Sequence, residues 1–255
     1  MDRKKWFILA LILLVILIWL VSPTIGNVNE PFWIFPHFSL LFDSDKALQI
    51  TQEFVTRFPR RVLGTFESRQ SAEFLMERLE SLGYKTGDSQ FDALIAGHRE
   101  VGRNVLASRP GQVPETLAVI AHYDTAPSTI QGAADDGSGI GVLLELARVL
   151  SESAPHRGLL FVASDGEGWG MLGALDLARH YPGRRNIAAV VSLDSVCAGS
   201  LGKIALDLVG QFGGYTPPWL RQISRRAAEG EELLVVSPFG FEEYLERSLL
   251  LSWTG

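Results

Sequence analysis

One imidazole and several carboxylates stand where short apolar runs of the sequence end. They are His122, Asp124, Asp135, Glu167 and Asp194. Carboxylates crowded at one edge of a sheet repel each other and raise each other's pKa values, so such a cluster needs a cation. An imidazole mixed with carboxylates suits zinc, whereas calcium and magnesium favour oxygen ligands only. Taken alone, a histidine at a strand end is more often a surface or core residue, so the indication comes from the set.

His122 and Asp124 form a His-x-Asp pair directly after the apolar run 116–121. One ring nitrogen of a histidine can bind a metal while a carboxylate holds the other N–H and so selects the tautomer. The pair therefore predicts that His122 is a metal ligand and that Asp124 orients it.

The spacing of apolar residues predicts an alternation of helices and strands after residue 45. We expect helices at 45–58, 68–82, 138–151 and 170–181, and strands at 104–108, 116–121, 158–163, 187–193 and 203–209. Strands that alternate with helices are typical of an α/β fold with a mostly parallel central sheet and helices on both faces. Ligands bind outside the carboxyl ends of such strands, which is where the imidazole and the carboxylates lie.

Four stretches occur in an order that resembles the M28 zinc aminopeptidases, namely AHYDT, GAADDGSGIGVLLELARVL, FVASDGEGWGMLGA and VVSLDSV. The resemblance runs from about residue 45 to residue 255, and it is specific because four ordered motifs match. It implies the zinc exopeptidase fold, which is phosphorylase/hydrolase-like, and hydrolysis of peptide substrates from a free N-terminus.

The resemblance also implies a role for each residue of the set. His122 and Asp194 would bind one metal, and Asp135 would be the carboxylate that bridges two metals. Asp135 is favoured over Asp136 because the family places this ligand at the first acidic position, often with a cis peptide directly after it. Glu167 falls on the general base that takes a proton from the attacking water, so Glu167 and Asp124 are the expected catalytic residues.

Two positions depart from the family pattern, and both concern the second metal. Gly168 stands where the family has a second glutamate, and the segment 239–253, where a last histidine is expected, contains none. The ligands of the first metal are complete, so one zinc is expected where the family has two. The alternatives are a catalytically degenerate binding module on the same scaffold and a glutaminyl cyclase-like acyltransferase. The resemblance also predicts a further strand and helix after Gly255.

The overall composition excludes several other classes. The formal net charge is −6 and the basic residues are scattered, so nucleic acid is not an expected partner. The single cysteine, Cys197, excludes an intramolecular disulfide and a cysteine-rich zinc knuckle.

An apolar segment lies near the N-terminus, at residues 6–21, behind a basic flank. Its length is close to the roughly 17–25 residues that span a bilayer, and the flank leaves the rest of the chain outside the cytoplasm. We expect a single-pass membrane protein with an anchor at 1–22, a linker at 23–44 and the peptidase-like domain at 45–255. A cleaved signal peptide is the competing interpretation.

Overall fold

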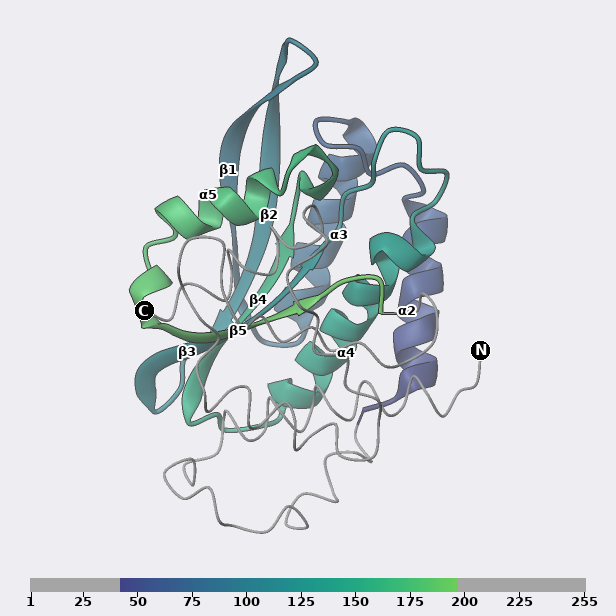
Figure 1. Cartoon of the computed structure of the whole chain (residues 1–255). Coiled ribbons are helices and arrows are strands. Elements are labelled where there is room, and N and C mark those ends of the chain that lie inside the picture. The colour runs from purple at the N-terminus through teal and green to yellow at the C-terminus, as the bar shows by residue number, and fades with distance from the viewer. Residues whose placement is uncertain (1–41, 197–255) are drawn as a thin grey trace, which may run out of the picture.

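A five-stranded sheet forms the centre of the computed structural model, which describes residues 42–196 (Figure 1). The strand order is β1-β2-β4-β3-β5. The strands are β1 (Lys85–Ile95), β2 (His98–Arg109), β3 (Val113–His122), β4 (Arg157–Ser164) and β5 (Ile187–Leu193). β3 pairs in parallel with β4 and with β5, whereas β2 pairs antiparallel with β1 and with β4.

The parallel part of the sheet follows the predicted alternation. Helix α4 (Ser138–Ser151) connects β3 to β4, and helix α5 (Leu172–His180) connects β4 to β5. Short helical turns precede these helices and β5, namely η3 (Ala133–Gly137), η4 (Glu167–Trp169) and η5 (Arg184–Asn186). The predicted strands 116–121, 158–163 and 187–193 are therefore confirmed, and they form the part of the sheet that bears the expected ligands.

The prediction of a mostly parallel sheet is wrong for β1 and β2, which form an antiparallel hairpin. The predicted strand 104–108 is the last part of the longer β2, and β1 was not predicted. Only two residues of β1, Phe91 and Ala93, are buried, so the strand lacks a clear apolar period. The turn has positive φ at both of its residues, Ala96 and Gly97, as in the two-residue turns of twisted hairpins.

Helices cover both faces of the sheet, as predicted (Figure 1). Leu117, Val119 and Ala121 of β3 join the large core under α2 (Ser44–Arg57), α3 (Phe66–Ser81) and α4. Ala118 and Ile120 point to the opposite face and pack with residues of α5. This alternation explains why β3 reads as a continuous apolar run, since both of its faces are buried.

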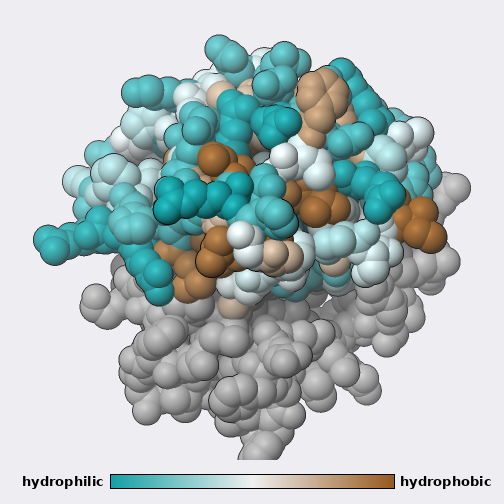
Figure 2. Space-filling view, turned by 90° about the horizontal axis from the view of Figure 1, so that it is seen from above, coloured by the Kyte–Doolittle hydropathy of each residue, from teal (hydrophilic) through white to brown (hydrophobic). Residues whose placement is uncertain are grey.

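On the face seen from above, apolar side chains form separate patches (Figure 2). In the view from above, polar residues lie between the apolar ones (Figure 2). The exposed large apolar side chains are Leu48, Phe66, Leu94, Val101 and Ile130. The two larger apolar clusters of the described residues are buried, one against each face of the sheet.

Several sequence predictions lie outside residues 42–196. They concern the anchor, most of the linker, the strand 203–209, Cys197 and the segment 239–253. Among the helices of residues 42–196, none has both the length and the hydropathy that crossing a bilayer requires.

Candidate metal centre

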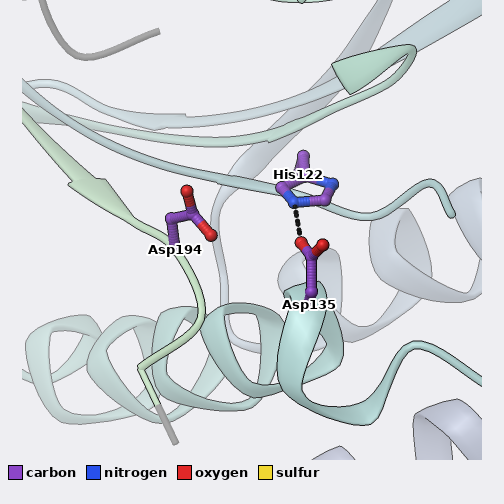
Figure 3. A group of neighbouring side chains, drawn as sticks. All are labelled: His122, Asp135 and Asp194. Atoms are coloured by element: carbon purple, nitrogen blue, oxygen red, sulfur yellow. Dashed lines mark hydrogen bonds and ion pairs between the residues drawn. The ribbon is translucent and has the colours of Figure 1, made fainter. Parts of the chain in front are cut away.

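Three side chains that could together hold a metal ion meet at the carboxyl edge of the parallel strands (Figure 3). His122 is the last residue of β3, and Asp194 follows the last residue of β5. Ala121 and Leu193 are register partners in the parallel pair, so the residues that follow them emerge side by side. Asp135 comes from η3, just before α4, and points up at the imidazole. Three segments distant in sequence therefore converge because the strands are parallel and in this register.

The distances fit a small cation. His122 Nε2 lies 2.8 Å from Asp135 Oδ1, and one ligand atom from each of the three residues lies within 4.8 Å of the others. Ligands of a tetrahedral zinc, each about 2.1 Å from the ion, are roughly 3.4 Å apart. Small side-chain rotations therefore suffice to bring the set to zinc geometry, and one imidazole with two carboxylates is a donor set that zinc accepts.

The cluster is buried on one side and open on the other. His122 is only 7% exposed, whereas the side chain of Asp135 is 67% exposed. Ligands fixed on the inner side leave the outer side available to water and substrate. A catalytic zinc site requires such an open position.

The charges around His122 indicate a site made for a cation. Burial by itself lowers the pKa of His122, but the carboxylates of Asp124, Asp135 and Asp136 outweigh burial and raise this pKa well above its usual value. The contact with His122 in turn lowers the pKa of Asp135. The protein thus concentrates negative potential on one buried imidazole, which favours any positive charge placed there.

Asp124 connects this histidine to the neighbouring loop. Asp124 is fully buried, and its Oδ1 lies 3.4 Å from His122 Nδ1, close enough for an ion-pair contact but without the geometry of a hydrogen bond. The same carboxylate accepts the backbone N–H of Glu167 at 3.0 Å and that of Gly168 at 3.4 Å. Asp124 therefore lies where the His-x-Asp pattern places it, and it also holds the loop that carries Glu167.

Glu167 begins the turn η4, directly after Gly166. Gly166 and Gly170, on either side of this turn, have positive φ, which glycine adopts without strain. At Gly168 an added Cβ would meet Ala126 at an ordinary 3.5 Å, so the lack of a side chain there is not imposed by packing. Within residues 42–196, His122, Asp135 and Asp194 are the group whose ligand atoms lie close enough together to hold a metal.

Asp136 differs from its neighbour Asp135, as the resemblance implied. The peptide between the two residues is cis. Asp136 is fully buried, and its Oδ1 accepts the N–H of Gly139 at 2.8 Å and that of Ser195 at 3.1 Å. Burial raises the pKa of Asp136 well above its usual value. This residue ties the start of α4 to the residue after Asp194, a role that the sequence pattern did not reveal.

Sequence reasoning also missed Arg61, whose side chain is fully buried and donates to the carbonyls of Tyr123 and Gly132. Arg60 and Arg61 are adjacent in a loop, where a basic pair is typical of a solvated surface. The pattern contains no signal that distinguishes the buried arginine from the exposed one.

A sequence model described as Peptidase family M28 matches residues 104–235 of this chain. The alkaline phosphatase isozyme conversion protein of Escherichia coli is 29% identical over 208 residues, which cover 72% of this chain and 59% of that protein. A probable zinc metalloprotease of Pyrenophora tritici-repentis is 41% identical over 83 residues, which cover 29% of this chain and 19% of that protein. The chain thus spans less than two thirds of the length of these relatives.

Two solved structures share the fold. A Zn-dependent exopeptidase from Parabacteroides distasonis superposes with a TM-score of 0.63 at 22% identity, covering 83% of this chain and 82% of that one. The glutaminyl cyclase of Porphyromonas gingivalis superposes with a TM-score of 0.63 at 24% identity and the same coverage. At this identity, the match describes the arrangement of the elements.

Proposed function

The chain belongs to peptidase family M28, and from this premise we propose that it is a zinc-dependent exopeptidase that cleaves peptides from a free N-terminus. The observation that carries the proposal is the convergence of His122, Asp135 and Asp194, with ligand atoms within 4.8 Å of one another, at the edge where Glu167 lies. One zinc is proposed, since Gly168 offers no carboxylate.

Zinc held by these three side chains would lower the pKa of a water molecule and polarise the scissile carbonyl. Glu167 accepts the proton of that water as the oxygen attacks the carbonyl carbon, and it returns the proton to the leaving amine. Asp124 keeps Nε2 of His122 directed at Asp135 and fixes the backbone of Glu167. The proposal thus assigns a residue of this chain to each step.

The apolar segment 6–21 supports a second part of the proposal, that the domain is anchored to a membrane and acts outside the cytoplasm. The experiment therefore uses the full chain, purified from membranes in detergent and supplied with zinc. Retention of the chain in the membrane pellet after an alkaline wash tests the anchor.

The decisive comparison is between two variants. Glu167→Gln is expected to keep about one zinc per chain and to lose roughly 10²- to 10⁴-fold in kcat/KM on a peptide with a free N-terminus. Asp135→Ala is expected to lose the zinc and the activity together. Glu115→Gln is the control, because Glu115 is an exposed carboxylate near the opposite end of β3 and is expected to change neither.

The outcomes separate the alternatives. A wild-type chain that binds no zinc would favour a binding module on a peptidase scaffold. Zinc binding with cyclisation of an N-terminal glutamine instead of peptide hydrolysis would favour the glutaminyl cyclase-like acyltransferase. Equal cleavage of the same peptide with an acetylated N-terminus would overturn the exopeptidase assignment.

A further inference from the structure

Arg61 is a fully buried arginine whose guanidinium donates hydrogen bonds to four backbone carbonyls. Its Nε donates to Tyr123 O at 2.6 Å, and its Nη1 donates to Phe58 O at 2.6 Å and to Gln131 O at 3.0 Å. Its Nη2 donates to Gly132 O at 3.1 Å. One guanidinium thus donates hydrogen bonds to four backbone carbonyl oxygens.

Three of these carbonyls, those of Tyr123, Gln131 and Gly132, lie at the two ends of one loop. Tyr123 is the residue after His122, whereas Gln131 and Gly132 come shortly before Asp135. The guanidinium therefore closes the neck of the loop, here defined as residues 123–132, between two of the three ligands. The backbone adds a further link, since the N–H of Thr125 donates to Arg61 O at 3.1 Å.

The residues at the neck of the loop pack tightly around the guanidinium of Arg61. Gly132 has φ +58°, and a Cβ there would lie 2.9 Å from Nη2 of Arg61 and 2.6 Å from Cγ2 of Thr125. The carbonyl of Gly132 also accepts the N–H of Gly137, at 3.0 Å, which connects the neck to the turn that bears Asp135. The ring of Phe54 lies 4.8 Å from Cζ of Arg61. The guanidinium therefore has contacts that hold it in one place.

The charge of Arg61 acts on the same site. Burial lowers the pKa of Arg61 to about 10, and the charges of Asp124, Asp136 and Asp135 oppose this shift. At neutral pH the side chain therefore remains a cation inside the protein. A buried cation whose donors all go to neutral carbonyls is costly unless nearby negative charge compensates it. Here that charge comes from residues of the metal centre.

We propose that Arg61 is a positioning residue of the metal site, whose guanidinium closes the neck of the loop 123–132 and so holds His122 and Asp135 at ligand distance. Its charge also compensates the crowded carboxylates. The proposal rests on the proposed metal site, and it predicts that metal affinity depends on a residue that never touches the metal.

The test is a zinc titration of the full chain carrying Arg61→Lys or Arg61→Met, with the visible absorption of bound cobalt as a second readout of ligand geometry. Arg61→Met removes the charge and all the donors, and we expect zinc to bind roughly 10- to 100-fold more weakly. Arg61→Lys keeps the charge but cannot span the four carbonyls, so we expect an intermediate loss and an altered cobalt spectrum. If Arg61→Met does not fold, the lysine variant carries the test.

Leu75→Ala is the matched control, because Leu75 is fully buried in α3 and belongs to the core. It is expected to lower stability by about 2–5 kcal/mol while leaving zinc affinity unchanged when all proteins are measured well below their unfolding temperatures.

Three results would overturn the proposal. In the first, both arginine variants bind zinc with an affinity within about threefold of the wild type and show the cobalt spectrum of the wild type. A threefold change is well below the 10- to 100-fold loss of affinity that is expected when a residue supporting the ligands is removed. The control could also lose as much affinity as the arginine variants, which would reduce the effect to general destabilisation. In the third, the wild-type chain does not bind zinc, which overturns the proposed function as well. Zinc binding by the wild type therefore distinguishes failure of the proposed function from failure of the role proposed for Arg61.

Discussion

Asp124 has two partners, the ring of His122 and the backbone N–H groups of Glu167 and Gly168. A carboxylate suits both the imidazole and the backbone N–H groups because its two oxygens only accept hydrogen bonds. An amide must turn its NH2 group, which only donates, toward one of these partners. At this position the charge of the residue matters as much as its shape.

We therefore expect Asp124→Asn to weaken zinc binding roughly 10- to 100-fold and to lower kcat as well. The amide cannot hold the N–H of the imidazole as a carboxylate does, and it repels the N–H of Glu167 if it turns the other way. Zinc titration and steady-state kinetics measure the two effects. Unchanged affinity with unchanged kcat would show that Asp124 has no part in orienting the site.

The elements bring these residues together through parallel pairing and close helix contact. Helix α4 begins directly after the turn that bears Asp135, and it packs on α2 across Gly141. A Cβ at Gly141 would overlap Thr51 Oγ1 and lie 2.5 Å from Ala47 O, so glycine is required for the two helices to lie this close.

Gly141→Ala tests this contact. Alanine is favoured over glycine in a helix by about 1 kcal/mol, but here we expect net destabilisation of about 1–3 kcal/mol because the helices must move apart. Urea unfolding measures the change. Gly87→Ala in β1 is the control, since nothing lies within 4 Å of its Cβ position, and it should change the free energy of unfolding by less than about 0.5 kcal/mol. A neutral or stabilising Gly141→Ala would contradict the close contact of α2 and α4.

The stability of the whole molecule should depend on pH through Asp165, which follows β4. Asp165 is 2% exposed, and burial, assisted by the charge of Asp124, raises its pKa to about 7 from 3.8. Between these two values the folded state holds a proton that the unfolded state has released. Stability is therefore highest below about pH 4 for this group, falls as pH rises toward about 7, and changes little above that value.

Asp165→Asn should remove this dependence, because the amide does not titrate. The difference between a pKa of 3.8 and a pKa of about 7 corresponds to roughly 4 kcal/mol at most. We expect the free energy of unfolding of the wild type, relative to that of the variant, to fall between about pH 4 and about pH 7. Denaturant unfolding at a series of pH values checks this, and parallel curves for the two proteins would contradict it.

For the whole molecule, the sequence by itself predicted the helices α2 to α5, the strands β3, β4 and β5, and the candidate ligands. These elements have strong apolar periods, and the carboxyl ends of parallel strands must share an edge, so His122 and Asp194 could be placed at one edge without coordinates. Their role as metal ligands is what the resemblance implies, and it stays a proposal. The membrane anchor and the segment after residue 196 stay predictions from the sequence.

Only the tertiary structure decided the rest. Strand β1 buries two residues, so its pairing depends on β2 and not on a pattern of its own. The roles of Arg61 and Asp136 come from hydrogen bonds to segments up to 71 and 59 residues away. Such polar contacts leave no periodic trace in the sequence, because burial of a charged side chain is set by what the folded chain places around it.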